Sequence, residues 1–207
     1  MFKIIKKEPL NPSMTRMVIE APFVARKAMP GQFIILRVNE TGERIPLTIA
    51  DYDREAGTVT IIYQKVGKST LLLDEQEAGG CLMDFIGPLG KASELEGYKK
   101  AAVIGGGAGC AIAYPQAKAL HAMGTKVDMI AGFRDKDLII LENEMREASD
   151  RLIVMTDDGS NGNKGFVTAA LQKNIDEGAD YDLVIAIGPI PMMKAVSNLT
   201  KPYGIKT

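Results

Sequence analysis

The sequence is poor in the residues that build metal sites and disulfide frameworks. It has two cysteines, Cys81 and Cys110, which lie far apart, and a single histidine, His121. Two isolated cysteines exclude a disulfide scaffold, and one histidine without cysteine or acidic companions does not make a zinc site. We therefore expect no metal site in this chain, with His121 on the surface or near a helix end and Cys110 in the core.

A charge excess and long apolar runs are missing as well. Lys and Arg number 25 against 26 Asp and Glu, so nothing indicates a nucleic-acid surface or a polybasic membrane patch. No segment approaches the length of a membrane span, and the N-terminus lacks the apolar stretch of a signal peptide. We expect a cytoplasmic protein with no nucleic-acid partner and no membrane span. Its 207 residues suffice for one large domain or two small ones.

Residues 1–97 read as an all-β domain, because short β-branched runs alternate with turn residues. Strands are expected at residues 2–5, 15–20, 32–38, 45–50, 58–64 and 81–86, with one short helix at 69–74. Six strands with so many turns predict a small closed barrel.

Two stretches of this half could bind an anion. The first runs from Arg44 through Pro46 to Thr48: arginine forms bidentate hydrogen bonds with a diphosphate, and a threonine hydroxyl can donate to a flavin heteroatom. Its alternative is an edge strand with a solvated arginine. The second is Gly67-Lys68-Ser69-Thr70, where free N–H groups, a lysine and two hydroxyls suit a phosphate, or where a plain helix cap suffices.

Residues 98–207 alternate strands with helices, which predicts a Rossmann-like parallel sheet. Strands are expected at residues 101–104, 126–132, 151–155 and 183–187, and helices at 113–123, 140–148 and 165–175. Ligands of such sheets bind beyond the carboxyl ends of the strands. The glycine cluster at 105–109 lies at one such end, yet its spacing is Gly-Gly-Gly-x-Gly, so both a nucleotide site and a tight structural turn remain open.

The second strand of this half ends in Gly132-Phe133-Arg134. The usual dinucleotide fold has an acidic residue there to hold the adenosine ribose. Arg134 could instead face a ribose phosphate, and Asp135 and Asp137 follow it. The choice between NADH and NADPH therefore stays open.

Taken in order, these motifs resemble the ferredoxin–NADP reductase family of flavoproteins. The similarity is greatest to its small electron-transfer subunits, those of class B dihydroorotate dehydrogenase and of NADH-dependent ferredoxin–NADP oxidoreductase, also called sulfide dehydrogenase subunit beta. The resemblance covers nearly the whole chain. Its motifs are residues 44–48, 66–70, 87–90, 105–115, 132–134, 156–160 and 188–189.

The resemblance implies an FAD-binding barrel (1–97) followed by an NAD(P)-binding domain (98–207). The FAD residues would be Arg44 toward the diphosphate, Pro46, Leu47 and Thr48 along the flavin, and Gly67, Lys68, Ser69 and Thr70 at the phosphates, with Thr48 as the catalytic contact. The residues for NAD(P)H would be Gly106, Gly107, Gly109, Arg134, Asp157, Gly188, Pro189 and Met192. Hydride would pass between NAD(P)H and FAD. Single electrons would then go to an iron–sulfur carrier, a ferredoxin or a larger flavin and iron–sulfur partner subunit.

The sequence departs from the family pattern at three places. Arg44 lies four residues before Thr48 instead of three, and Ile187 stands where the family often has cysteine. The family continues into a cysteine cluster that holds a [2Fe–2S] centre, which two cysteines cannot ligate, so we expect a C-terminally truncated chain. Two alternatives remain: a dihydroorotate dehydrogenase electron-transfer subunit, and a non-catalytic nucleotide-sensing module.

Overall fold

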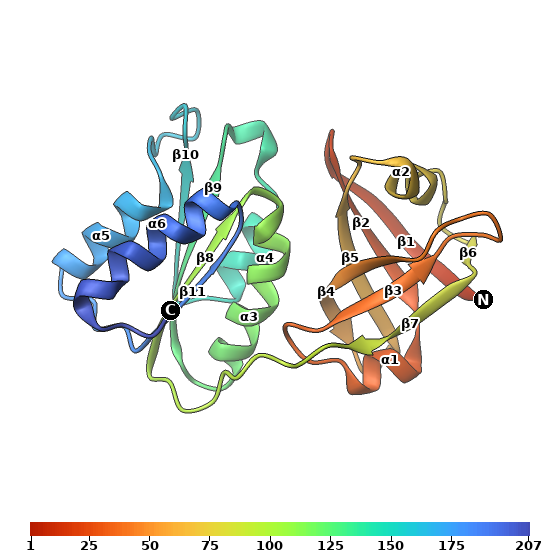
Figure 1. Cartoon of the computed structure of the whole chain (residues 1–207), viewed down its shortest axis with the longest axis horizontal. Helices are drawn as coiled ribbons and strands as arrows, with labels where there is room; N and C mark the ends of the chain where they lie inside the picture. Colours follow the sequence, from red (N-terminus) through yellow and green to blue (C-terminus); the bar gives the residue numbers. More distant parts are fainter. The chain divides into compact units, whose positions relative to one another are not determined.

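The computed structural model describes residues 1–207, and these divide into two compact units, Met1–Ser93 and Glu94–Thr207 (Figure 1). The first unit is built mainly from antiparallel strands and the second from parallel strands with helices. The sequence had placed the boundary after Gly97. No helix of the structure has the length and apolar character needed to cross a membrane.

Seven strands form one antiparallel sheet in the first unit. They are β1 (Phe2–Asn11), β2 (Met14–Glu20), β3 (Phe33–Arg37), β4 (Ile45–Asp53), β5 (Thr58–Gln64), β6 (Cys81–Leu82) and β7 (Asp84–Leu89). Their order in the sheet is β6-β1-β2-β5-β4-β3-β7. The strands β6 and β7 end this order on opposite sides, yet only Met83 separates them in the chain, so the two edges meet and the sheet curls into a nearly closed barrel.

The barrel predicted from the sequence is confirmed, but its strand count differs. The expected strand at 81–86 is interrupted at Met83, whose N–H is shared between the carbonyl oxygens of Arg37 and Val38 at 3.0 and 3.1 Å. This residue passes the chain from one sheet edge to the other. One predicted strand therefore becomes two, and the sheet has seven strands where six were expected.

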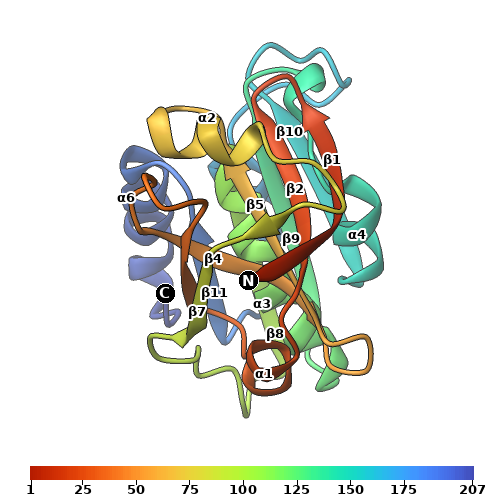
Figure 2. The same cartoon turned by 90° about the vertical axis from the view of Figure 1, so that its right-hand side faces the viewer.

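Two short helices lie at opposite ends of the barrel, α1 (Pro22–Lys27) and α2 (Lys68–Asp74) (Figures 1 and 2). The sequence predicted α2 and missed α1. Pro22 stands in the first turn of α1, where its fixed φ suits a helix start, and Val24 and Ala25 are buried in the barrel core. A six-residue helix has too short a hydrophobic pattern to be distinguished from a loop in the sequence.

The second unit is a parallel sheet covered by helices on both faces, as predicted. Its strands β8 (Lys100–Gly106), β9 (Lys126–Phe133), β10 (Arg151–Thr156) and β11 (Leu183–Ile187) stand in the order β10-β9-β8-β11. The helices are α3 (Cys110–Ala122), α4 (Glu142–Glu147), α5 (Val167–Asp176) and α6 (Ile190–Thr200), with 3-10 turns η1 (Gly107–Gly109), η2 (Lys136–Leu138) and η3 (Lys201–Tyr203). In Figure 1 the pair α3 and α4 covers one face of the sheet, and α5 and α6 pack together on the other.

The central strand β8 explains this layering, because residues 101–106 are all buried. A strand buried on both faces needs a helix layer on each side. Ala102 and Ile104 pack toward α5 and α6, against Leu171 and Val196. Beyond β11, the backbone at Lys206 makes a parallel bridge with Leu183.

Candidate cofactor-binding sites

In its first half, before the register shift between Ile49 and Asp51, the strand β4 presents even-numbered residues outward. Ile45 and Leu47 pack against the barrel core, whereas Pro46 is exposed and Thr48 half-buried. Because side chains alternate along a strand, the four-residue spacing places Arg44 on the same side as Thr48. An arginine three residues before Thr48 would instead point into the core.

Leu47 does not join this outer face. Its side chain lies against the barrel core, so only its backbone could line a ligand there. The backbone has an open side, since β5 pairs with β4 only from Ile49 onward, whereas Leu47 and Pro46 pair with β3 alone. Pro46 thus occupies the kind of one-sided position in which a proline is tolerated. The hydroxyl of Thr48 makes no hydrogen bond to the protein and remains available to a ligand.

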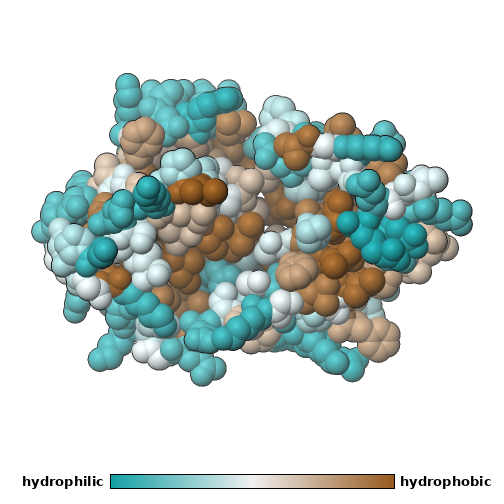
Figure 3. Space-filling view, in the orientation of Figure 1, coloured by the Kyte–Doolittle hydropathy of each residue, from teal (hydrophilic) through white to brown (hydrophobic).

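The neighbouring strands extend this face with apolar side chains. Thr48 lies opposite Phe33 on β3, Pro46 lies opposite Ile35, and Ile35 in turn lies opposite Ile86 on β7. Ile86 is 49% exposed, a high value for isoleucine. We call these five residues the outer strip. In Figure 3 the visible face of the barrel unit likewise shows apolar atoms beside strongly hydrophilic ones.

The outer strip ends at three charged side chains. Arg37 Nε and Arg44 Nη2 bond to the same oxygen of Asp84, Oδ2, at 2.8 and 2.9 Å. Arg44 is therefore paired with Asp84, although its side chain remains 54% exposed to solvent. Arg37 and Asp84 were missed from the sequence. Alternation along Phe33, Ile35 and Arg37 could have placed Arg37 outward, but the pairing needs the register of three strands.

The turn before α2 holds the second predicted anion site. The hydroxyl of Thr70 accepts hydrogen bonds from the N–H groups of Val66 and Gly67, both at 3.1 Å, and donates to the Gly67 carbonyl at 3.0 Å. That hydroxyl is fully used within the turn and shapes it. The first bond of the helix runs from Leu71 N to Gly67 O, so the N–H groups of Lys68 and Ser69 lie ahead of it.

The backbone conformation at Gly67 does not require glycine. Its φ of −154° is extended backbone that any residue adopts, and a Cβ added there would meet no atom within 4 Å. The chain therefore keeps open space at this point. Lys68, which follows, makes no ion pair with the protein and is exposed. Open space, free N–H groups and an unpaired lysine suit an approaching phosphate.

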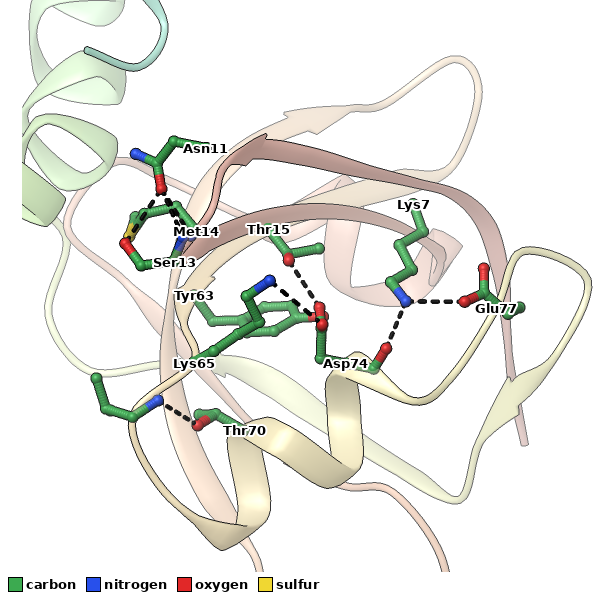
Figure 4. A network of polar contacts seen from close by, with 11 residues as sticks. Lys7, Asn11, Ser13, Met14, Thr15, Tyr63, Lys65, Thr70, Asp74 and Glu77 are labelled. Atoms are coloured by element: carbon green, nitrogen blue, oxygen red, sulfur yellow. Dashed lines mark hydrogen bonds and ion pairs between the residues drawn. The ribbon is translucent and has the colours of Figure 1, made fainter. Parts of the chain in front are cut away.

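The far end of α2 is fastened to the barrel by Asp74 (Figure 4). Its carboxylate accepts hydrogen bonds from the Thr15 hydroxyl at 2.7 Å and the Tyr63 hydroxyl at 3.1 Å, and Lys65 Nζ lies at 3.6 Å. Lys7 donates to the Asp74 backbone carbonyl. Thr15 and Tyr63 are 1% and 2% exposed, so water does not reach their hydroxyl groups. Both hydroxyls therefore depend on the Asp74 carboxylate as their hydrogen-bond acceptor.

These contacts set the ionisation of the cluster. Burial raises the pKa of Asp74, but the Thr15 and Tyr63 hydrogen bonds and the two lysines outweigh it and hold that pKa below its usual range. Burial also raises the pKa of Tyr63, and the neighbouring Asp74 carboxylate raises it further. At neutral pH the network therefore consists of a charged carboxylate and a neutral phenol.

In the second unit, the predicted NAD(P)H residues lie at or shortly after the carboxyl ends of the strands. Register places these ends side by side: Gly106 and Met155 flank Gly132, and Ile187 lies opposite Gly105. The sheet order reverses between β8 and β11, so the glycine turn and the Gly188-Pro189 turn border the switch point. Open α/β sheets bind ligands at that point.

Packing explains most of the glycine cluster. A Cβ on Gly105 would lie 2.7 Å from Cys110 Sγ, one on Gly106 would lie 2.5 Å from Met192 Sδ, and one on Gly109 would lie 2.3 Å from the Ile187 carbonyl oxygen. Gly107 differs, since its φ is +55° and nothing lies within 4 Å of its Cβ position. Gly105, Gly106 and Gly109 therefore fit the tight structural turn, Gly107 is explained by its positive φ, and the nucleotide site stays a prediction.

The ends of β9 and β10 carry the polar residues. Arg134 is 77% exposed and pairs with Asp135 at 3.1 Å. The carboxylate of Asp158 accepts a bond from the Ser160 N–H, which lowers its pKa, whereas Asp157 is exposed and its carboxylate makes no bond to the protein. Ser160 also accepts a bond from the Lys136 N–H, which ties the two strand ends together.

Three further residues fall where the sequence placed them or nearby. Cys110 is fully buried, and burial raises the pKa of its thiol to about 12, so it is a core residue and no thiolate. His121 lies on the surface near the end of α3, 3.8 Å from Asp150. Met192 lies in the first turns of α6 with its thioether against Gly106 and Gly188. No group of metal-ligating side chains occurs in the structure.

Comparison with known proteins shows which family the chain resembles. Residues 103–198 match the family described as the oxidoreductase NAD-binding domain. The chain is 41% identical to the dihydroorotate dehydrogenase B (NAD(+)) electron transfer subunit homolog of Thermotoga maritima, covering 98% of this chain and 71% of the relative. It is 32% identical to the dihydroorotate dehydrogenase B electron transfer subunit of Geobacillus sp., over 95% of this chain and 77% of the relative.

A solved structure of NADH-dependent reduced ferredoxin-NADP oxidoreductase superposes with a TM-score of 0.91 at 39% identity, covering 99% of this chain and 74% of that one. The chain therefore belongs to the ferredoxin–NADP reductase type of oxidoreductases, in the family of their electron-transfer subunits. The family resemblance seen in the sequence is confirmed.

Proposed function

We propose that this chain is an FAD-dependent electron-transfer subunit that takes a hydride from NADH or NADPH and passes single electrons to a partner. The observation that carries the proposal is the outer strip. Its mostly apolar side chains end at an exposed arginine, an arrangement that would suit the ring system and the diphosphate of a flavin nucleotide. The names of the relatives support the same activity.

FAD would be held by two features of the barrel. The strands β3 and β5 both run antiparallel to β4, so Arg37 at the end of β3 and the α2 turn after β5 lie at the same end of the barrel. Arg44 and the N–H groups of Lys68 and Ser69 would bind the phosphates from this end. Pro46 and the Leu47 backbone would border the flavin ring, while Gly67 keeps the approach open.

Thr48 would donate its free hydroxyl to the flavin near the reacting edge and so orient the ring. When bound, FAD would supply the hydride acceptor that changes a two-electron donor into a source of single electrons. The chain itself needs no acid, base or nucleophile for this reaction. Its residues hold the ring and exclude alternative orientations.

NAD(P)H would bind the second unit at the switch point. Gly107 offers the open backbone position, and Gly106 and Gly109 keep the turn tight beneath it. Asp157 and Arg134 are exposed at the adjoining strand ends and would contact the ribose and its substituents. Gly188, Pro189 and Met192 would border the nicotinamide. The partner would be a larger flavin or iron–sulfur subunit or a ferredoxin, and the relatives' names make a dihydroorotate dehydrogenase catalytic subunit the second candidate.

An absorbance spectrum of the purified protein, with added FAD if needed, tests the first step. We expect oxidised flavin bands that bleach on anaerobic titration with one of NADH and NADPH. Steady reduction of an artificial acceptor then separates an enzyme from a nucleotide-sensing module. A protein that takes up no FAD contradicts the proposal, and one that binds FAD without turnover supports the sensor.

A further inference from the structure

Three charged side chains lie next to one another across β4, β3 and β7. Arg37 is in register with Asp84, and Arg44 directly precedes β4, whose first residue Ile45 pairs with Leu36, the neighbour of Arg37. Like charges at opposed positions of neighbouring strands repel. Here a single carboxylate oxygen, Asp84 Oδ2, accepts from both guanidinium groups at 2.8 and 2.9 Å. The carboxylate therefore makes the approach of the two arginines possible.

The three residues differ in exposure. The side chains of Arg37 and Asp84 are 21% and 23% exposed, whereas that of Arg44 is 54% exposed. Two positive charges and one negative charge leave one positive charge in the group, and it is Arg44 that reaches solvent. Arginine has five N–H donors, and Asp84 contacts Arg44 only through Nη2. The remaining donors are free for an anion.

We propose that Arg37 and Asp84 are positioning residues for Arg44. Asp84 fixes the Arg44 guanidinium at the end of the outer strip, and Arg37 offsets the carboxylate so that Arg44 keeps a net attraction for a diphosphate. The inference rests on the proposed binding of FAD. It adds two residues that hold the arginine to the one that contacts the cofactor.

The Asp84→Asn variant separates positioning from charge. If Asp84 only neutralised the arginines, its removal would tighten binding of the FAD diphosphate, most of all at low salt. If it positions Arg44, its removal weakens binding at low and high salt alike. We expect FAD to bind the variant about tenfold more weakly at both salt concentrations, by analogy with other lost charged hydrogen bonds. Quenching of FAD fluorescence measures the dissociation constant without turnover.

A double-mutant cycle shows whether the effect passes through Arg44. In the Arg44→Gln background, Asp84→Asn should change FAD affinity by less than about twofold, because the group it positions is gone. Arg37→Gln is the second variant. Without Arg37, Asp84 can pair with Arg44 through both oxygens, which leaves Arg44 fewer charge-assisted hydrogen bonds for the diphosphate. We therefore expect FAD to bind this variant about threefold more weakly. Glu8→Gln, which breaks the Lys6 and Arg16 pairs on β1 and β2, is the matched control.

The outcomes distinguish the two proposals. A wild-type chain that binds no FAD overturns both. A wild-type chain that binds FAD, with an Asp84→Asn variant that binds it equally or more tightly, overturns the positioning role alone. An equal loss of affinity in the wild-type and Arg44→Gln backgrounds does the same, because Asp84 would then act through the fold. Unfolding midpoints of all variants, measured by circular dichroism, exclude loss of the barrel as the cause.

Discussion

In the function proposed above, the two units would bind a phosphate-bearing ligand by different means. The barrel uses side chains, with Arg44 held on the outer face and Lys68 left unpaired. The α/β unit uses backbone, with a glycine turn whose members are fixed mostly by contacts to β11 and α6. Even the glycines differ, because Gly109 has no room for a Cβ and Gly67 has room to spare. Gly109 is thus explained by packing, whereas packing does not explain Gly67.

The strongest test of this contrast is Gly109→Ala. Its new Cβ would lie 2.3 Å from the Ile187 carbonyl oxygen, a backbone atom that cannot move without shifting β11. We expect a loss of more than about 3 kcal/mol in unfolding free energy, measured by chemical denaturation. Gly107→Ala is the control and should cost about 1 kcal/mol, for the positive φ alone. Equal costs for both variants would contradict the packing interpretation.

The next largest effect concerns Asp74, which fastens α2 to the barrel. Asp74→Asn removes the negative charge that strengthens the hydrogen bonds from Thr15 and Tyr63 and attracts the two lysines. We expect the unfolding free energy at pH 7 to fall by about 2 kcal/mol. The pKa of Asp74 is lower in the folded state than in the unfolded chain. The contribution of Asp74 to folding stability is therefore complete at pH values above its unfolded pKa of about 4. It is lost as the pH falls toward the pKa of the folded state.

Urea denaturation at a series of pH values checks this sign. The stability difference between wild type and Asp74→Asn should shrink as the pH falls from about 5 to about 2. Asp176→Asn on α5, where Gln172 donates to Asp176 at 2.8 Å, is the control in the other unit and keeps its acceptor. If wild type and Asp74→Asn lose stability in parallel on acidification, Asp74 is not the titrating group.

A smaller effect is expected for Thr48→Val, which removes a hydroxyl and keeps the shape. We expect flavin reduction by the nicotinamide nucleotide to slow by about tenfold, the cost of one hydrogen bond that orients the ring. Stopped-flow bleaching of the flavin under anaerobic conditions measures the rate. Thr60→Val on β5 is the control. Unchanged rate and FAD occupancy would remove Thr48 from the site.

The smallest effect on the fold is expected for Gly67→Ala. Its extended backbone accepts alanine, so the variant should be as stable as the wild type or gain up to about 0.5 kcal/mol from a less flexible unfolded chain. FAD should nevertheless bind several-fold more weakly, about threefold to tenfold, because the Cβ enters the space that a phosphate would use. Fluorescence titration and thermal unfolding check the two halves of this prediction. Unchanged FAD affinity would show that this open space serves no ligand.

What the sequence could predict depended on distance along the chain. The strands β5 and β11 were placed with the observed bounds, because each is a β-branched run between clear turn residues. The order of motifs was also enough to recognise the family. The helix α1 was missed because six residues carry too little hydrophobic pattern. The break at Met83 was missed because it is caused by hydrogen bonds to Arg37, the last residue of β3, and to Val38.

The sequence predicted single residues of the candidate site but not the contacts between residues that lie far apart in the chain. Arg44 and Thr48 were identified from residue type, but Asp84 lies 40 residues from Arg44 and meets it only through the register of three strands. The glycines of residues 105–109 were identified as a turn, yet which of them face neighbours depends on β11 and α6, about 80 residues later. Short-range chemistry is visible in a sequence, whereas long-range register is not.

The single residue between β6 and β7 has a consequence for the making of the protein. The outer edges of β1 and β3 both receive their second partner from residues 81–89, the last stretch of the barrel to be synthesised. Until the ribosome has released that stretch, the five preceding strands can form only an open sheet with two bare edges. Closure of the barrel therefore depends on one late segment that pairs with both edges of the sheet. A nascent chain that stops before Cys81 would expose two unpaired strand edges, which could pair with another chain.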